Sequence, residues 1–330
     1  MSAAPNRRLV AVVLLIPIVV ALVLWAFAWP AARMAPRDLP VGVVGTGPAA
    51  DRLQEQLEAR DGAFEIHRYD SEAAARTAIE HRAVYGAITV TAQGPELLTA
   101  TAAGPVVAQL LHDAVAAQAP DGAAARVTDV VAAPAADPRG SVLGSSILPL
   151  AIAGVATGAV VTLLGLRGRR AAGALLGVAA LVGMVAAALT DSWLGVLTGD
   201  WWSEAGAFGL TVLAIGATVA GLAALIGTAG IGLGSLVMVL VGNPFSGVTS
   251  APELLPRPVG AIGQWLAPGA GGSLLRSVAF FDGNAAAGPL LALSLWTVLG
   301  LIAVLAGGRR RRTRTAESAA APGRRPAPVG

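Results

Sequence analysis

Residues 205–241 read AGAFGLTVLAIGATVAGLAALIGTAGIGLGSLVMVLV, a run without a charged side chain, and GNPFSG follows at residues 242–247. One membrane crossing needs about 20 apolar residues at a rise of about 1.5 Å per residue. The run is nearly twice that length, so it predicts two spans joined by a tight turn. We expect the turn near Gly227-Thr228-Ala229-Gly230, although a turn nearer Gly221 would divide the run more evenly.

The whole chain is apolar enough for lipid to surround much of it. Of its 330 residues, 55% are hydrophobic and 13% are charged, and the mean hydropathy is +0.68. A soluble globule of this size would need more polar groups to cover its surface. Four further segments have the length of a span or nearly so, at residues 9–29, 142–166, 171–189 and 287–307. The sequence therefore predicts an α-helical polytopic protein of the plasma membrane with six transmembrane helices.

The arginines predict which way the spans face, because basic residues near span ends are biased to the cytoplasm. Arg7-Arg8 precede the first span, Arg167-Gly168-Arg169-Arg170 joins the second to the third, and residues 309–312 follow the last. Only six spans place all three groups on one side. Residues 1–8 and a disordered basic tail at 308–330 are then cytoplasmic, and of the twenty acidic residues only Glu317 lies inside.

The first apolar segment, residues 9–29, has a second interpretation as a cleaved signal peptide. Its length exceeds the 7–15 residues typical of a signal-peptide core, and Arg33 and Met34 make a poor cleavage site. We favour a membrane anchor.

Residues 33–140 are more polar and alternate like a small α/β domain inserted between the first and second helices, on the extracytoplasmic side. Two β-α-β units predict a mostly parallel sheet covered by helices. Part of residues 102–136, rich in alanine, is predicted to be a flexible stalk. The predicted strands are 39–44, 64–69, 84–90 and 96–100, and the predicted helices are 48–60, 72–82 and 105–118.

No set of residues in this domain predicts catalysis. Residues 42–47 have the spacing G-x-x-G-x-G, which favours a tight turn over a dinucleotide site. His67, His81 and His112 lack the short paired spacing of a zinc site. The chain contains neither cysteine nor lysine, so a thiolate metal site and a Walker A lysine are both excluded. We predict no cofactor, no metal and no enzymatic activity, and we interpret the domain as a binding or assembly module.

The spans as assigned contain no Asp, Glu, Lys, Arg or His. Ion-coupled carriers generally place such groups at membrane depth, so a self-powered secondary transporter is disfavoured. Small residues are abundant instead, which favours close helix packing or dimerisation over a phosphate-binding loop. They include Gly154, Gly158, Gly173, Gly177, Gly183, Gly230, Gly232 and Gly234.

A proline-rich segment at residues 243–283 precedes the last span. Its five prolines at 244, 252, 256, 258 and 268 prevent a long helix, yet the segment stays apolar. Irregular backbone facing lipid would leave polar groups unpaired, so the segment must be re-entrant or lie at the outer interface. Short helices are predicted at 258–266 and 273–281. An outer gate or lateral exit and a purely structural loop are equally favoured interpretations.

The arrangement resembles a known class of membrane protein. One span, an α/β domain, five more spans and a proline-rich outer loop look like the permease of type-2 ABC exporters and the related phage-infection-protein-like membrane proteins. The residues that carry the resemblance are Gly242-Asn243-Pro244-Phe245-Ser246-Gly247, Pro252-Glu253-Leu254-Leu255-Pro256, Pro268-Gly269 and Leu275-Arg276, with Val41-Gly42-Val43-Val44 and Tyr85-Gly86-Ala87-Ile88 in the domain.

The resemblance implies a homodimeric or heterodimeric permease that moves an amphiphilic or peptide-like substrate outward, energised by a separate ATP-binding subunit. It implies an outer gate at Asn243, Pro244, Phe245, Ser246, Gly247, Pro252, Glu253, Pro256, Pro268 and Arg276.

The cytoplasmic coupling loop would consist of Arg167, Arg169 and Arg170 with Gly168, and four residues are too few for a docking helix. An alternative function is therefore open: a non-transporting membrane anchor whose extracytoplasmic domain binds a cell-envelope partner. The arginines lie beside spans, so we expect them to contact membrane lipids rather than nucleic acid.

Overall fold

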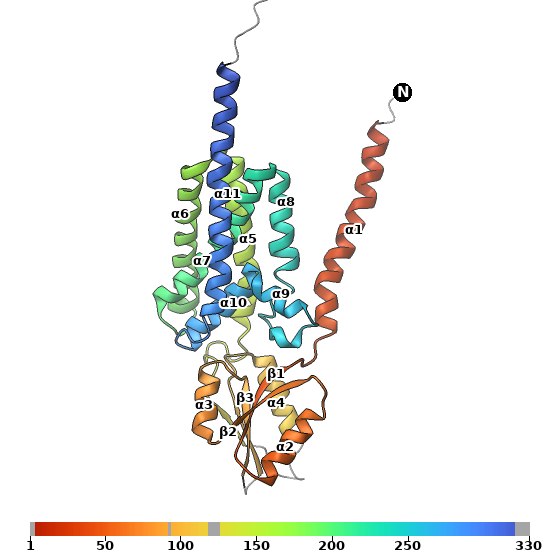
Figure 1. Ribbon diagram of the computed structural model, residues 1–330, viewed down its shortest axis with the longest axis vertical. Coiled ribbons are helices and arrows are strands. Elements are labelled where there is room, and N and C mark those ends of the chain that lie inside the picture. Colours follow the sequence, from red (N-terminus) through yellow and green to blue (C-terminus); the bar gives the residue numbers. More distant parts are fainter. Residues whose placement is uncertain (1–3, 92–93, 118–125, 321–330) are drawn as a thin grey trace, which may run out of the picture.

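The computed structural model describes residues 4–91, 94–117 and 126–320. The chain is mostly helical, with a small sheet domain at one end of a helix bundle (Figure 1). Five described helices are long and apolar enough to cross a membrane. These crossing segments are Val13–Ala32 within α1 (Ala4–Ala32), Ser141–Leu163 (α5), Gly168–Trp193 (α6, Gly168–Ala187, with a π-helical turn, η1, Ala188–Trp193), Trp201–Ile226 (α7) and Ala287–Gly307 within α11 (Ala287–Ala320).

The long apolar run folds as two antiparallel helices of unequal length. Helix α7 ends at Gly227, which has a φ of +77°, and α8 (Ala229–Ser235) begins two residues later. The turn therefore lies near Gly227, as the first of the two predictions had it, and not near Gly221. A glycine adopts positive φ without a steric penalty, which explains why the helix reverses there.

The fifth of the six predicted spans is short. Because α7 uses 26 residues of the run, α8 and the π-helical turn η2 (Leu236–Val241) together cover only Ala229–Val241. At about 1.5 Å per residue this helix reaches about 20 Å, against about 30 Å of hydrocarbon. The prediction of six full-length transmembrane helices is thus not confirmed, and the described chain has five such helices and one shorter apolar helix.

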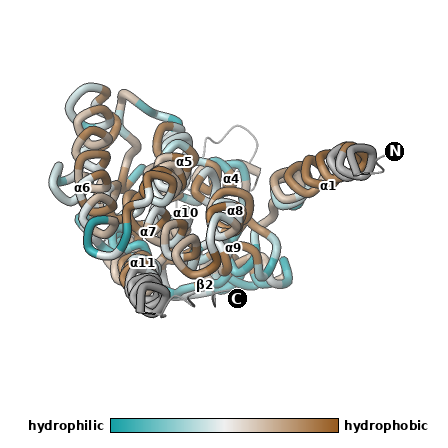
Figure 2. Tube along the Cα trace, turned by 90° about the horizontal axis from the view of Figure 1, so that it is seen from above, coloured by the Kyte–Doolittle hydropathy of each residue, from teal (hydrophilic) through white to brown (hydrophobic). Residues whose placement is uncertain are grey.

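Helix α7 is the centre of the bundle, with α5, α6 and α11 packed around it (Figure 2). Glycine allows these backbones to approach closely, because an added Cβ at Gly158 would lie 2.6 Å from the carbonyl oxygen of Gly216. Of the eight glycines expected to pack, Gly173, Gly177 and Gly232 have no heavy atom within 4 Å of such a Cβ, and the other five are in close contact within the chain.

Helix α1 stands beside the bundle and apart from the other spanning helices (Figures 1 and 2). Only 11% of its apolar window is buried, whereas 67% of the α7 window is. Near its end the rings of Trp25 and Trp29 stack at 5.4 Å between centroids. Most of the surface of α1 is therefore available to lipid.

The sheet domain contains five strands in the order β2-β1-β3-β4-β5. All neighbouring strands are parallel except the β3–β4 pair, so the mostly parallel sheet is as expected. The strands are β1 (Leu39–Val44), β2 (Phe64–Tyr69), β3 (Gly86–Thr91), β4 (Gly94–Thr99) and β5 (Arg126–Asp129), and the helices are α2 (Pro48–Glu58), α3 (Glu72–Glu80) and α4 (Pro105–Ala116).

Strand β5 lies within residues 102–136, part of which the sequence predicts to be a flexible stalk, and the strand residues do not belong to that part. β5 is short and polar, and it extends the sheet by pairing with β4. The Asp129 carboxylate accepts hydrogen bonds from the amide and the hydroxyl of Thr101, at 3.1 and 2.6 Å. These contacts are long-range, and alanine-rich composition alone does not reveal them.

The C-terminal helix is longer than predicted. Helix α11 continues to Ala320, whereas a disordered tail is predicted from residue 308. Alanine and arginine favour helix, and a helix already formed in the span extends at little cost because nucleation is complete. Residues 321–330 lie outside the described residues.

The sheet domain packs on the proline-rich segment rather than standing free of it. Ala251 and Leu254 join the core cluster formed by β1, β4 and α4, and Phe281 joins a second cluster with Ile79 and Val84. The backbone amide of Arg37 also donates to the carbonyl oxygen of Glu253, at 3.0 Å. The domain and the proline-rich segment therefore share a hydrophobic core.

Candidate functional site

The proline-rich segment folds into short helices at the domain end of the bundle (Figure 1). A 3-10 turn, η3 (Pro252–Leu254), precedes α9 (Val259–Trp265) and α10 (Ala267–Phe280). Helix α10 is buried, and the side chain of Leu275 has no exposed surface. The segment packs into the protein, which satisfies the requirement that irregular backbone avoid lipid.

The turn at residues 243–247 is held by its own hydrogen bonds and by α9. The Ser246 hydroxyl donates to the carbonyl oxygen of Asn243 at 2.7 Å, and the Gln264 amide donates to the carbonyl oxygen of Ser246 at 2.7 Å. Gly263 faces the carbonyl group of Phe245 so closely that no side chain fits between them. Gly247 has a φ of +65°, which favours glycine at this position.

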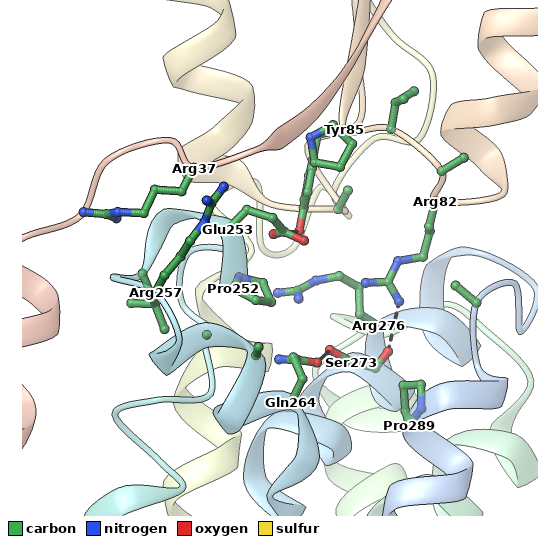
Figure 3. A pocket seen from close by; sticks show the side chains of 18 of the residues that line it. Arg37, Arg82, Tyr85, Pro252, Glu253, Arg257, Gln264, Ser273, Arg276 and Pro289 are labelled. Atoms are coloured by element: carbon green, nitrogen blue, oxygen red, sulfur yellow. Dashed lines mark hydrogen bonds between the residues drawn. The ribbon is translucent and has the colours of Figure 1, made fainter. Parts of the chain in front are cut away.

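A cavity of about 440 Å³ lies between the sheet domain and the proline-rich segment (Figure 3). Four of the ten predicted gate residues line it, namely Pro252, Glu253, Pro256 and Arg276, and the other six lie outside it. Its lining also includes polar side chains that the sequence did not predict as gate residues, which are Arg37, Arg82, Tyr85, Arg257, Gln264 and Ser273.

Arg82 and Tyr85 reach into this cavity from the loop between α3 and β3 (Figure 3). The Tyr85 hydroxyl donates to Oε2 of Glu253 at 2.8 Å. The Arg82 guanidinium donates to the carbonyl oxygen of Ser273 at 3.1 Å and to the hydroxyl of Ser277 at 2.6 Å. These bonds join the domain to η3 and α10 across the cavity.

Burial and charge shift the pKa values of these groups. Burial, followed by the nearby Glu253 carboxylate, raises the pKa of Tyr85 above its usual range, so its hydroxyl remains a donor. Burial lowers the pKa of Arg82, and burial together with the charge of Arg82 lowers the pKa of Arg276. Both guanidinium groups nevertheless keep their charge at neutral pH.

We expect the Tyr85→Phe variant to lose about 1–3 kcal/mol of stability, because the half-buried Glu253 carboxylate loses this hydrogen-bond donor. Thermal unfolding of the full chain in detergent would measure the change. The matched control is Tyr69→Phe at the only other tyrosine, whose hydroxyl makes none of the side-chain hydrogen bonds seen in the described residues. Equal melting temperatures for the two variants would contradict the assigned role of the Tyr85 hydroxyl.

The opposite end of the bundle contains the predicted coupling residues. Arg167 precedes α6, Arg169 and Arg170 lie in its first turn, and all three are exposed. The link from Leu163 to Gly168 contains no helix, as its length predicts. Cations near the first turn of a helix interact unfavourably with the helix dipole, so these arginines do not stabilise α6. A second cavity, of about 230 Å³, lies between this link, the α7–α8 turn and α11.

One buried carboxylate corrects the expectation that the spans contain no ionisable residue. Helix α7 begins four residues earlier than the predicted span, which places Glu204 in its first turns without exposed surface. Its Oε1 accepts the backbone amide of Gly199 at 2.9 Å. This hydrogen bond fixes the loop before α7 to the first turns of the helix.

Among the described residues, no group of three or more His, Cys, Asp or Glu side chains is placed to hold a metal ion. His67 lies on β2, His81 follows α3 and His112 lies on α4.

Fold and site together define a multi-pass membrane protein with a sheet domain packed on one end of its bundle. Residues 7–130, from α1 to β5, match the family model described as ABC-2 family transporter protein. This match supports an ABC-2-type permease, so the resemblance is confirmed at the level of a transporter family, whereas the closer likeness to phage-infection proteins is not. No curated protein and no solved structure gave a match. The proline-rich motif lies outside the matched residues.

Proposed function

We propose that the chain is the membrane permease subunit of an ABC-type exporter that moves an amphiphilic or peptide-like substrate outward, energised by a separate ATP-binding subunit. The observation that carries the proposal is the shared core of the sheet domain and the proline-rich segment, next to the matched family region. The segment with its cavity acts as the outer gate.

In this proposal the chain crosses the membrane six times, with the helix at Ala229–Val241 as a short fifth crossing. The start of α1 and the end of α11 lie at the end away from the sheet domain, together with the α5–α6 link (Figure 1). Arginines gather at that end, which favours the cytoplasm. The sheet domain is then extracytoplasmic.

Hydrogen bonds between the sheet domain and the proline-rich segment support coupled motion of the domain and the gate. The Asn284 amide donates to the carbonyl oxygen of Glu80 at 3.3 Å, and Tyr85 holds Glu253 on the other side of the cavity. A displacement of the domain must therefore displace η3 and the end of α10 as well. A substrate or a second subunit that binds to the domain would therefore move the gate through these contacts.

The ATP-binding subunit would dock at Arg167, Arg169 and Arg170. Since the link is too short for a docking helix, the contact would also include the α7–α8 turn beside the second cavity. A dimer of permease subunits completes the exporter, as is common in the ABC-2 family.

Co-purification tests this function. We expect the tagged full chain, extracted with its native membrane, to bring down an ATP-binding protein whose ATP hydrolysis rises when both are placed in liposomes. Replacing all three arginines by glutamine should reduce the recovery of the ATP-binding protein severalfold, and the Arg60→Gln exchange in the exposed turn after α2 should not. Full recovery with the triple variant would contradict docking at this link.

The helix-free link also favours the second candidate, a non-transporting anchor whose domain binds a cell-envelope partner. This function predicts that the chain is recovered without an ATP-binding protein and with an envelope component that is lost when the sheet domain is shaved by protease.

The orientation is tested on the naturally cysteine-free chain. Arg139→Cys and Leu164→Cys place exposed thiols just beyond the two ends of α5. We expect a membrane-impermeant maleimide added to intact cells to label the first and not the second, and to label both after lysis. The reverse pattern in intact cells would invert the proposed topology.

A further inference from the structure

Two guanidinium groups, of the buried Arg276 and the half-buried Arg82, lie at the large cavity without a carboxylate partner. Arg276 is 5% exposed, and its Nε has no hydrogen-bond partner. The ion pairs within 4.0 Å in the described part of the chain include neither Arg82 nor Arg276. Burying a cation without a counter-charge costs several kcal/mol, so such an arrangement calls for an anion.

The neighbouring groups neutralise this charge only in part. The Arg276 guanidinium donates to the carbonyl oxygen of Val248 at 2.8 Å, and Arg82 donates to Ser273 and Ser277. Glu253 is the single carboxylate in the lining, and one of its oxygens already accepts the Tyr85 hydroxyl. The cavity therefore has more positive than negative charge even when Glu253 is counted.

The other arginines of the lining have partners of their own. Arg257 forms an ion pair with Asp38, and Arg37 donates to the carbonyl oxygens of Arg33, Ala35 and Leu254. The uncompensated charge thus lies on Arg82 and Arg276, which face the cavity from opposite sides, one from the domain and one from α10 (Figure 3).

The cavity has the size and place of a headgroup site. Its volume of about 440 Å³ falls in the range of small-ligand pockets, and prolines with Leu255 and Ala261 give it an apolar wall. Exposed tryptophans at the same end of the bundle, Trp25, Trp193, Trp202 and Trp265, mark the membrane interface, where lipid phosphates lie.

We propose that this cavity binds a phosphate group, held between the guanidinium groups of Arg82 and Arg276, with the ester substituent against the apolar wall. Arginine suits this task because its planar fork matches phosphate oxygens. The phosphate comes from a lipid in the adjoining leaflet or from a soluble phosphate ester. The site is independent of the proposed transport, since an anchor protein would bind the same group.

The test is calorimetric titration of the purified full chain in a non-ionic detergent with three probes. Dihexanoyl phosphatidic acid has both phosphate and acyl chains, dihexanoylglycerol has the chains alone, and glycerol 3-phosphate has the phosphate alone. We expect phosphatidic acid to bind at one site per chain and dihexanoylglycerol to bind at least roughly tenfold more weakly. If glycerol 3-phosphate binds as tightly as phosphatidic acid, the site is supported and its ligand is a soluble phosphate ester. If glycerol 3-phosphate binds more weakly than phosphatidic acid, the ligand is a lipid.

Two variants with opposite expected signs separate the charge effect from a folding defect. Arg82→Gln should weaken phosphatidic acid binding at least roughly tenfold, because one charged donor is lost. Glu253→Gln removes the only carboxylate of the lining, so it should tighten binding severalfold. Arg60→Gln, in the exposed turn after α2 and not among the residues that line the cavity, serves as the matched arginine control and should match the wild type.

The proposal is overturned if dihexanoylglycerol binds as tightly as phosphatidic acid, or if phosphatidic acid does not bind. It is also overturned if Glu253→Gln fails to tighten binding while its melting temperature stays near that of the wild type.

Discussion

The Gly183→Leu variant is expected to lose the packing of α6 on α7. An added Cβ at Gly183 would overlap the carbonyl group of Ala205 and lie 3.0 Å from the backbone nitrogen of Gly209. Backbone atoms cannot rotate away as a side chain can, so the two helices must separate. Overpacking by single methylenes already costs about 1–3 kcal/mol, and a whole leucine side chain should exceed that range. We expect a fall in melting temperature of at least about 5 °C, measured in detergent.

The same helix offers a matched control. Gly177 lies on an exposed face of α6, with no heavy atom within 4 Å of an added Cβ. Gly177→Leu introduces the same side chain on the same helix, where it meets lipid, so the melting temperature of the monomer should stay close to that of the wild type. A similar loss for both variants would mean that general helix effects, rather than contact with α7, account for the result.

The Gly263→Val variant is expected to displace the turn at residues 243–247 and to abolish the proposed export. Gly263 in α9 faces the carbonyl group of Phe245 with no room for a Cβ. The clash is again with backbone, so the turn must move away from α9 and lose the Gln264 bond to Ser246. We expect a destabilisation of more than about 3 kcal/mol in thermal unfolding.

Gly232→Val is its control, because Gly232 lies exposed on α8 with nothing within 4 Å. This variant should unfold near the wild-type temperature and should export normally. If Gly263→Val retained a wild-type melting temperature, the close contact with Phe245 would not exist as described. If it unfolded early but exported at the wild-type rate, the turn would not be part of the gate.

Sequence patterns located most of the helices because the relevant physics is local. An apolar run of sufficient length must cross lipid as a helix, and a glycine that can adopt positive φ ends α7 near the predicted point. Alternation of strands and helices likewise indicated the parallel part of the sheet. Strand β5 was missed because a short polar strand exists only through its pairing with β4.

The candidate site was predicted only in part, for a different reason. The proline motif drew attention to Pro252, Glu253, Pro256 and Arg276, which do line the cavity. Tyr85 belongs to the domain pattern that carries the family resemblance, but neither that pattern nor the residues around Arg82 indicate a site, since one residue follows a helix and the other precedes a strand. Their partners are remote, and Arg82 and Ser277 are 195 positions apart.

By itself the sequence determined that this chain is a multi-pass membrane protein with a polar α/β domain and a proline-rich segment, because hydropathy and chain length decide what lipid tolerates. Only the tertiary structure decided that the apolar helix at Ala229–Val241 is short, that the domain shares a core with the proline-rich segment, and that Arg82 and Arg276 meet at one cavity. Those features depend on which distant surfaces fit together, and no local pattern specifies that fit.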